Sequence, residues 1–404
     1  MADSAATILQ IIPELDTGGA ELSTIEIAEA IVIAGGRALV LTQGGRMLDR
    51  LRATGADVRL FPAATKNPVR LAANAKAIAS MIEDDDVALV HARSRAPAWS
   101  GLWAARRTKR PFVTTYHGAY NEKSALKRFY NGVMARGDLV IANSGYTRDL
   151  IRSRYGTPDG RIRVIHRGVD MASFDAEKVS ADRVARLRSA WGVGPGDRVI
   201  LHAARLTTWK GQHVVVEAAR LLHEQGQLDG VVALAGDAQG RDAYADGLRA
   251  AIRASGLEGR VRLVGHVDDM PAAYLLADAS VVASIEPEAF GRTAVESQAM
   301  GCPVIATRIG APQETVLSPP EHGPRSMTGW LVAPGDARAM ADAILWALSL
   351  DAVSRGEMAT RARAHAAASF SLRQMRLKTL QVYDEILGTA FHANYVAARP
   401  QNDG

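Results

Sequence analysis

Cysteine is nearly absent from this 404-residue chain, which contains Cys302 alone. A disulfide framework and a cysteine-rich metal site are therefore excluded, and a reducing cytosol is the simplest compartment. The first residues lack the basic and apolar segments of a signal peptide, and no apolar run approaches the ~20 residues of a membrane span. We expect a cytoplasmic protein, with peripheral attachment to the inner face of the membrane as an alternative.

The whole chain is short of neither positive nor negative residues, but the two signs are unevenly distributed. Residues 1–170 hold 24 Lys and Arg against 17 Asp and Glu, whereas residues 171–404 hold 24 against 26. A basic half suits an acidic partner such as phosphate, nucleic acid or an anionic membrane. A solvated basic surface explains the excess equally well.

Short apolar runs alternate with amphipathic stretches, twice over, which predicts two α/β domains with parallel sheets. The first series of predicted strands is Thr7–Ile12, Ala38–Thr42, Val58–Phe61, Ala88–His91, Phe112–Thr115, Leu139–Ala142 and Arg163–Ile165. The second series is Val199–Ala203, Val231–Leu234, Val261–Val264, Ser280–Ala283 and Val304–Ala306.

A glycine and proline cluster at residues 192–196 marks the start of the second series. We predict a Rossmann-like domain at 1–170, a linker at 171–197, a second Rossmann-like domain at 198–370, and a terminal helix at 371–391 that packs back on the first domain. The two sheets would face each other across a cleft. Ligands of open parallel sheets bind beyond the carboxyl ends of the strands, so the loops that follow strands are the places to search.

In the first domain, Gly18 and Gly19 lie between the first strand and a helix, where backbone N–H groups can approach an anion. A plain turn is the alternative. His91 and His117 each stand at the end of a strand. A lone histidine is more often structural, but two at the ligand edge favour function, His117 more than His91.

In the second domain, Arg205 and Lys210 bracket the loop after the first strand. A planar donor fork with a point charge suits a diphosphate, although two surface cations are the alternative. Glu288 and Glu296 flank a loop and the start of a helix, with Phe290 and others between them. Carboxylates accept hydrogen bonds from sugar and ribose diols, and the helix N-terminus can bind an anion.

At this point the chain resembles the large retaining glycosyltransferase family 4, whose members adopt the GT-B fold. The resemblance covers nearly the whole chain, and the order and spacing of its motifs are specific although single pieces are not. The motifs are Gly18–Glu21, Gly168–Asp170, Arg205 with Lys210–Gly211, Gly236–Asp237, Val264–Val267, and Glu288 to Glu296 followed by Ala299–Ala306.

The resemblance implies a metal-independent hexosyltransferase that uses no cofactor and retains the anomeric configuration. The donor would be a UDP- or GDP-linked sugar, and the acceptor a glycan or glycolipid, with no nucleic acid involved. Bacterial members often build surface glycans, lipopolysaccharide cores included, and we expect such a role. The leaving diphosphate itself would take the acceptor proton, and no nucleophilic carboxylate is assigned.

The resemblance also implies roles for individual residues. Gly18 and Gly19 would lie near the donor phosphates and the acceptor, and His117 would contact the transferred sugar. Arg205 and Lys210 would bind the diphosphate. His117, Arg205 and Lys210, with Glu288, are the candidate catalytic residues.

Further donor contacts follow from the same resemblance. The backbone of Val267 would lie near the base, Glu288 would hold the sugar and Glu296 the ribose. Between the two acids, the donor-binding candidates are Phe290, Gly291 and Arg292.

The sequence departs from the family pattern at three places. Arg167 precedes Gly168 where Asn-Pro is frequent, and residues 310–314 differ mildly from Gly-Gly-x-x-Glu. Arg292 replaces a residue that is often apolar, which leaves the donor sugar open. The rival functions are a nucleotide-sugar epimerase of the same fold and a non-catalytic sugar-nucleotide binding module; a pyridoxal-phosphate phosphorylase would need far more length.

Two charged features complete the picture. Residues 84–86, three aspartates at a helix end, have no histidine or cysteine nearby, so we interpret them as solvated and expect activity without a metal. The stretches 105–110 and 123–130 are basic, and on a helix Leu126, Phe129 and Tyr130 share one face. Such a helix suits an anionic membrane surface, or equally a core helix with solvated charges.

Overall fold

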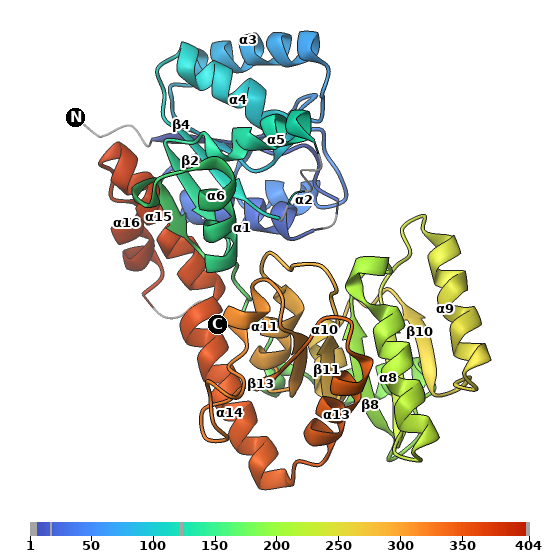
Figure 1. Ribbon diagram of the computed structural model, residues 1–404. Coiled ribbons are helices and arrows are strands. Elements are labelled where there is room, and N and C mark those ends of the chain that lie inside the picture. Colours follow the sequence, from blue (N-terminus) through green and yellow to red (C-terminus); the bar gives the residue numbers. More distant parts are fainter. Residues whose placement is uncertain (1–5, 17, 119, 121–123, 401–404) are drawn as a thin grey trace. The chain divides into compact units, whose positions relative to one another are not determined.

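The computed structural model describes residues 6–16, 18–118, 120 and 124–400 (Figure 1). The chain divides into two compact units. Among the described residues, the first comprises those up to 168 together with 372–400, and the second comprises residues 169–371. Each unit contains one fully parallel sheet with helices on both faces, the arrangement of a Rossmann-like domain.

The first unit has a seven-stranded sheet with strand order β3-β2-β1-β4-β5-β6-β7. Its strands are β1 (Thr7–Ile11), β2 (Arg37–Thr42), β3 (Asp57–Leu60), β4 (Val87–Ala92), β5 (Phe112–Tyr116), β6 (Leu139–Ala142) and β7 (Ile162–Val164). Its helices are α1 (Gly19–Ile33), α2 (Leu48–Arg52), α3 (Pro68–Asp84), α4 (Arg95–Arg107), α5 (Ala125–Asn131), α6 (Gly145–Tyr155), α15 (Leu372–Leu387) and α16 (Phe391–Ala398). The strand order reverses between β1 and β4, so the loops after these two strands are neighbours at the carboxyl edge.

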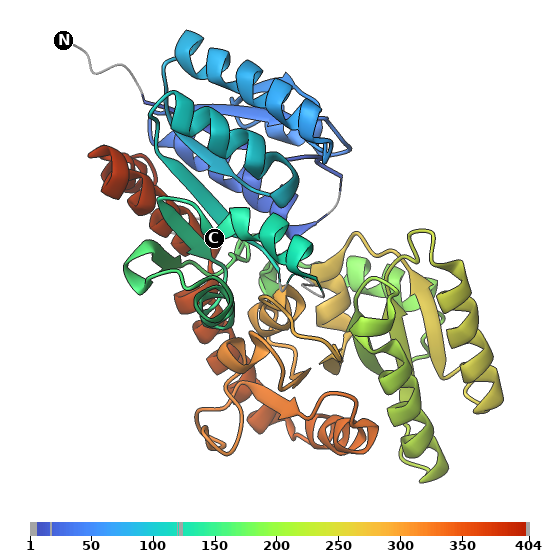
Figure 2. The ribbon, with the colours of Figure 1, turned by 45° about the horizontal axis from the view of Figure 1, so that its top comes forward.

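Alternation along β1 places cores on both faces of this sheet. Ile8 packs in a core shared with α1, α15 and α16, whereas Leu9 packs under α3 and α4. Figure 2 shows α15 and α16 (red) running beside the strands of the first unit. The single terminal helix expected at 371–391 is two helices, because Gly388 (φ 68°) ends α15 before Phe391 begins α16.

The second unit has a six-stranded sheet with strand order β10-β9-β8-β11-β12-β13. Its strands are β8 (Arg198–Ala203), β9 (Gly230–Ala235), β10 (Val261–Gly265), β11 (Ala279–Val282), β12 (Val304–Thr307) and β13 (Gly329–Val332). Its helices are α7 (Ala181–Ala190), α8 (Gln212–Glu224), α9 (Asp242–Ala254), α10 (Met270–Leu276), α11 (Arg292–Ala299), α12 (Pro312–Thr315), α13 (Ala337–Leu348) and α14 (Ala352–Phe370). Here the order reverses between β8 and β11. Sequence analysis missed β13, a four-residue strand at the sheet edge.

The segment 171–197, expected to be a linker, packs within the second unit. Val179, Trp191 and Val193 are 5–8% exposed and belong to the core formed with α10. Between these anchors, α7 contains no buried residue. Its charged composition therefore resembles that of a free connector, although both of its flanks are fixed in the core.

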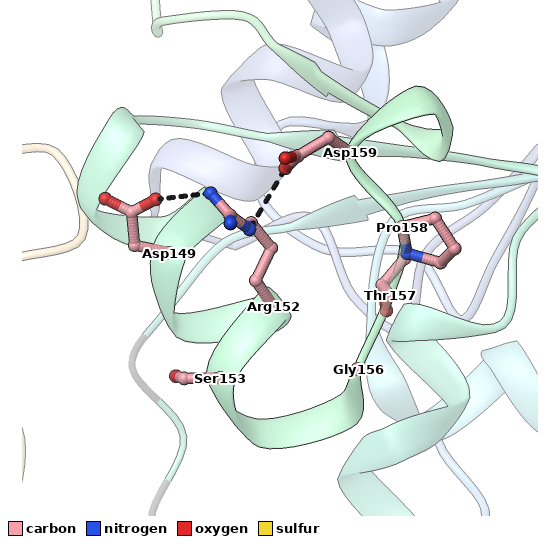
Figure 3. A pocket seen from close by; sticks show the side chains of 7 residues that line it. All are labelled: Asp149, Arg152, Ser153, Gly156, Thr157, Pro158 and Asp159. Atoms are coloured by element: carbon pink, nitrogen blue, oxygen red, sulfur yellow. Dashed lines mark ion pairs between the residues drawn. The ribbon is translucent and has the colours of Figure 1, made fainter.

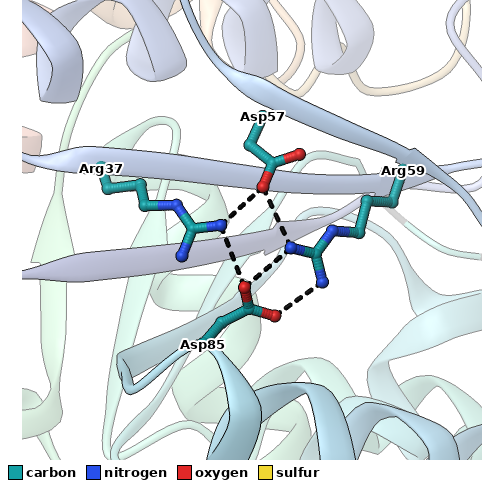
Figure 4. A network of polar contacts seen from close by, with 4 residues as sticks. All are labelled: Arg37, Asp57, Arg59 and Asp85. Carbon is teal, nitrogen blue, oxygen red and sulfur yellow. Dashed lines mark hydrogen bonds and ion pairs between the residues drawn. The ribbon is translucent and has the colours of Figure 1, made fainter.

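An ion network joins β2, β3 and the residue after α3 at the β3 side of the first sheet (Figure 4). Arg37 of β2 contacts Asp57 at 2.6 Å and Asp85 at 2.9 Å, and Arg59 of β3 contacts the same two carboxylates at 3.1 and 2.6 Å. The interpretation of residues 84–86 as solvated is therefore wrong for Asp85, whose side chain is 11% exposed. Asp86 remains 81% exposed and pairs with Arg110.

Candidate functional site

The loop after β8 presents Arg205 and Lys210 at the carboxyl edge of the second sheet. It lies against the end of β11, because a Cβ atom on Gly211 would stand 1.9 Å from the carbonyl oxygen of Ala283. Gly211 also has φ 73°, a conformation that side chains oppose. Glycine at this position thus brings the loops after β8 and β11 together, at the point where the strand order reverses.

Lys210 and Glu288 form an ion pair across these two loops. The Glu288 carboxylate also accepts a hydrogen bond from Ser284 at 2.6 Å. Both charged side chains are largely buried, with 17% and 9% exposed. The backbone of Glu288 forms a bridge with Gly310, so the carboxylate is held on a fixed support. Two of the predicted catalytic residues are therefore in direct contact.

Arg205 differs from Lys210 in its surroundings. Its side chain is exposed, and in the described part of the chain no carboxylate pairs with it. Lys210 lies over the ring of Trp209, 4.2 Å from the centroid. The edge therefore offers one exposed cation, Arg205, and one cation, Lys210, that is paired with Glu288.

Glu296, on α11, is buried and already has two partners. Its carboxylate accepts from Arg292 at 2.7 Å and from the Tyr274 hydroxyl at 3.3 Å. Burial raises the pKa of Glu296, and the charge of Arg292 opposes that rise. Arg292 and Glu296, both predicted donor-binding residues, thus form an ion pair on the first turns of α11.

The remaining donor candidates of this unit differ in what they expose. Phe290 is 2% exposed and packs against Phe370, so its side chain is part of the core. Gly291 precedes α11, whose N-terminus has no side-chain cap. Val267 is half-buried in the loop after β10, packed against a core that includes Tyr274.

In the first unit, His117 follows β5 and contacts Arg167, which follows β7. Arg167 donates from Nη2 to Nδ1 of His117 at 3.0 Å. The same guanidinium lies over Gly19, where a Cβ atom would stand 2.2 Å from Nη1. At Gly18 a Cβ atom would stand 2.4 Å from the Glu21 carboxylate. The first-unit candidates Gly19 and His117 therefore meet at Arg167.

His91 has a structural position. It is fully buried, its Nδ1 is 2.8 Å from the Tyr383 hydroxyl, and its Nε2 is 2.7 Å from the Thr115 hydroxyl. Its neighbour Arg93 is 3% exposed and donates to Ser23 of α1 at 2.7 Å. Burial lowers the pKa of Arg93 to about 10. His91 thus ties α15 to the sheet and has no ring nitrogen left for a ligand.

Several residues of these edges were not identified from the sequence. Arg93 directly follows β4 and Ser284 lies two residues after β11, and these positions could have indicated them. Tyr274 lies in mid-helix on α10, and no local signal links it to Glu296. Arg167 was noted only as a departure from the family pattern.

A surface pocket lies elsewhere in the first unit (Figure 3). It is lined by the end of α6 and the turn before β7, including Ser153, Gly156 and Thr157. Arg152 bridges Asp149 and Asp159 across it at 3.8 and 3.1 Å. This is the amino edge of the strands and its charges are paired, so we do not assign the pocket to the functional site.

Two negative findings concern the described ranges only. No group of three or more His, Cys, Asp or Glu side chains is placed to hold a metal ion. Within the same ranges, no helix is both long and apolar enough to cross a membrane.

Comparison with known proteins gives consistent matches. Residues 17–173 match the model of Glycosyltransferase Family 4, and residues 184–367 match that of Glycosyl transferases group 1. A D-inositol 3-phosphate glycosyltransferase of Xylanimonas cellulosilytica is 31% identical over 73% of this chain and 71% of its own length. The relatives from Jonesia denitrificans and Mycobacterium tuberculosis are matched over 64% and 62% of their lengths.

Solved structures agree over nearly the whole chain. A glycosyltransferase from Rickettsia africae is 34% identical with a TM-score of 0.86, covering 95% of this chain and 99% of that one. Anabaena HepE, solved with UDP and glucose, is 27% identical with a TM-score of 0.80, covering 93% and 99%. The predicted family and fold are confirmed: the chain belongs to glycosyltransferase family 4 and has the two Rossmann-like units of the GT-B fold.

Proposed function

We propose that this glycosyltransferase transfers a hexose from a nucleoside diphosphate sugar to a glycan or glycolipid acceptor, with retention of configuration and without a metal. The observation that carries the proposal is the Lys210–Glu288 ion pair beside the exposed Arg205. Arg205 and Lys210 supply positive charge for the diphosphate, and Glu288 supplies an acceptor for the hydroxyls of the sugar. The Anabaena structure with UDP and glucose favours a UDP-linked donor, with a GDP-linked donor as the alternative.

Donor binding rearranges this ion pair in the proposed mechanism. The diphosphate draws Lys210 away from Glu288, because a phosphate carries more charge and more acceptor oxygens than one carboxylate. Glu288 is then free to accept hydrogen bonds from hydroxyls of the sugar. Arg205, Lys210 and the uncapped N-terminus of α11 stabilise the negative charge that grows on the leaving diphosphate.

Ribose recognition falls to Glu296. Its carboxylate exchanges the Tyr274 hydroxyl for a ribose hydroxyl, while Arg292 keeps it ionised against the effect of burial. The leaving diphosphate accepts the acceptor proton on the face from which it departs. This route retains the configuration and needs no covalent intermediate on a carboxylate.

The function is tested by incubating the purified chain with UDP- and GDP-hexoses and a panel of glycan and glycolipid acceptors, in excess EDTA. We expect a glycoside with the anomeric configuration of the donor, read from its proton NMR coupling. Inverted product, or activity that returns only with manganese, contradicts the mechanism. An epimerised donor without acceptor identifies an epimerase, and donor binding without turnover identifies a binding module.

The acceptor side has a distinct surface on α4 and α5, which we call the aromatic patch: Trp99, Trp103, Leu126 and Phe129. Trp103, Leu126 and Phe129 are 41%, 77% and 56% exposed. Trp99 stacks on Phe129 at 5.1 Å and contacts Trp103 at 5.9 Å. The predicted face with Tyr130 is wrong in one member, because Tyr130 packs against the core and its carbonyl accepts from Trp99.

Cations surround the aromatic patch. Arg136 lies 5.0 Å from the Trp99 ring and 5.2 Å from the Phe129 ring, and Lys127 and Arg128 are exposed on α5. In the other basic stretch, Arg106 and Arg110 pair with aspartates. Lys123 lies outside the described residues. Exposed aromatic rings beside exposed cations fit the interface of an anionic membrane, and each such cation contributes about 1 kcal/mol there.

We infer that this patch brings the enzyme to a membrane-bound acceptor, in keeping with a role in surface polysaccharide or lipopolysaccharide synthesis. Vesicle co-sedimentation tests it with the double variant Leu126→Ser, Phe129→Ser. Wild type should sediment with anionic vesicles and lose binding in salt, and the variant should not sediment. Trp346→Ser, at an exposed tryptophan of the second unit, is the control. Equal binding of all three proteins would exclude this patch as the membrane-binding surface. If no protein binds anionic or neutral vesicles, a soluble acceptor is the better proposal.

A further inference from the structure

His117 has one ring nitrogen engaged and one available. Nδ1 accepts the hydrogen bond from Arg167, whereas Nε2 is buried and has no partner among the described residues. The ring is therefore fixed from one side and retains one hydrogen-bonding position for a ligand. The rest of its surroundings decide whether that position donates or accepts.

The guanidinium of Arg167 faces this ring and the first residue of α1. A side chain at Gly19 would meet Nη1 at 2.2 Å, so glycine at the first position of α1 makes room for the arginine. Gly19 and Arg167 are thus one packing arrangement that delivers a cation to Nδ1 of His117.

A guanidinium only donates hydrogen bonds and does not lose its proton in proteins. The nitrogen that faces it must therefore carry a lone pair, which places the proton of a neutral imidazole on Nε2. Two arginines near the ring, Arg167 after β7 and Arg93 after β4, disfavour a second proton on it, and His91 on β4 is a further titratable group with the same effect. Burial first, and then these groups, lower the pKa of His117 well below its ordinary value.

We propose that Arg167 is a positioning residue that holds His117 as a neutral imidazole with its single N–H at Nε2. His117 then acts as a hydrogen-bond donor to a substrate oxygen, and it cannot serve as a general base, because the lone pair of Nε2 is occupied by the proton. The identity of that oxygen, on the sugar or its phosphate, rests on the proposed function. The protonation state does not.

Long-range proton–nitrogen NMR of protein labelled at histidine nitrogens tests the assignment directly. The His117 signals are identified by their loss in His117→Gln. We expect wild-type His117 to be protonated at Nε2 alone and not to titrate near pH 6.5, the ordinary pKa of histidine. In Arg167→Met the pKa of the ring should rise above that of wild type, because a positive charge beside the ring has been removed.

Two further variants distinguish a specific effect of Arg167→Met from a general folding defect. Arg167→Lys keeps a charged donor and should preserve the wild-type spectrum. Arg163→Met removes another arginine of the β7 region, one that pairs with Glu385, and should change nothing at His117. A wild-type ring protonated at Nδ1, or titration that is the same in wild type and Arg167→Met, overturns the proposal.

Kinetics give the second readout. If His117 donates from Nε2, Arg167→Met should lose roughly 10-fold in kcat/KM, mostly toward acidic pH where its ring becomes charged. Adding Arg167→Met to His117→Ala should cost little more, because the two residues act together. Full additivity contradicts the coupling. A chain that shows the expected spectra but transfers no sugar refutes the proposed function and leaves the role of Arg167 intact.

Discussion

Lys210 and Arg205 differ in a respect that mutation can separate, since Lys210 is neutralised by Glu288 and Arg205 is not. Both should stabilise the leaving diphosphate. We expect Arg205→Ala and Lys210→Ala each to lower kcat/KM by roughly 10²-fold, the scale of one lost charged contact in the transition state. Initial rates at several donor concentrations measure this. Arg249→Ala, an exposed arginine on α9, is the control, and near-normal rates in the first two variants would exclude a diphosphate role.

We expect Glu288 to compete with the donor diphosphate for Lys210 and to bind the sugar of the same donor. Glu288→Gln removes the charge that competes for Lys210, so UDP without a sugar should bind equally well or more tightly. Turnover should nevertheless fall by roughly 10-fold or more, because the amide is a weaker acceptor for sugar hydroxyls. Calorimetry of UDP binding beside steady-state rates separates the two effects. Weaker UDP binding in this variant would contradict the exchange of partners at Lys210.

At the scale of elements, the close approach of the loop after β8 to the end of β11 depends on Gly211. An alanine in a left-handed conformation costs about 1–2 kcal/mol, and at Gly211 its Cβ also meets a carbonyl oxygen at 1.9 Å. Gly226, at the end of α8, has φ 64° with open space around it. Gly211→Ala should therefore destabilise the chain clearly more than Gly226→Ala in urea unfolding. Equal losses would show that the loop can move aside.

The ion network of β2, β3 and the end of α3 makes the free energy of unfolding depend on pH. The hydrogen bond from Arg59 is the main cause that lowers the pKa of Asp85 below its ordinary 3.8. Because the unfolded chain binds this proton more readily, the contribution of Asp85 is complete above about pH 5 and is lost as the pH falls below the ordinary value.

Asp85→Asn should accordingly cost about 1 kcal/mol or more near neutral pH, since both arginines lose a partially buried partner. The deficit should shrink as urea unfolding is repeated at progressively lower pH. Asp86→Asn, at the neighbouring exposed aspartate, should have little effect at any pH. A deficit at Asp85 that does not change with pH would assign it to packing and not to charge.

On the scale of the whole molecule, the first unit is completed by residues from the far end of the sequence. Leu372, Leu380 and Tyr383 of α15 are at most 7% exposed in the core with α1. Each such side chain contributes roughly 1.5–3 kcal/mol, so together they approach the total stability of a domain, about 5–15 kcal/mol.

A chain that ends at residue 370 should therefore lose amide protection throughout the first unit and keep it in the second. Hydrogen exchange read by mass spectrometry localises the change. A chain that ends at Arg399 keeps α15 and α16 and serves as the control. Unchanged protection in the shorter chain would mean that residues 7–168 fold without their terminal helices.

Local sequence predicted much of this architecture. The twelve short apolar runs and their intervening amphipathic stretches are local properties. The alternation of strands and helices could therefore be read directly, with the bounds of the strands correct within a residue or two. β13 was missed, although strands as short as β7 were found, so its length alone does not explain the miss. The ligand edge followed from topology, which is why Arg205, Lys210 and Glu288 could be selected by their places after strands.

Sequence by itself determined the family, the two parallel sheets and the loops in which charged residues gather, because each depends on local pattern and order along the chain. Tertiary structure alone decided which partners those residues have. The Tyr383–His91 bond joins residues 292 positions apart, and the Arg167–His117 bond joins residues 50 apart. Such contacts form only when strands take their places in the sheet, so no local pattern encodes them. They distinguish His91, whose two ring nitrogens both have partners in the core, from His117, whose Nε2 has none among the described residues.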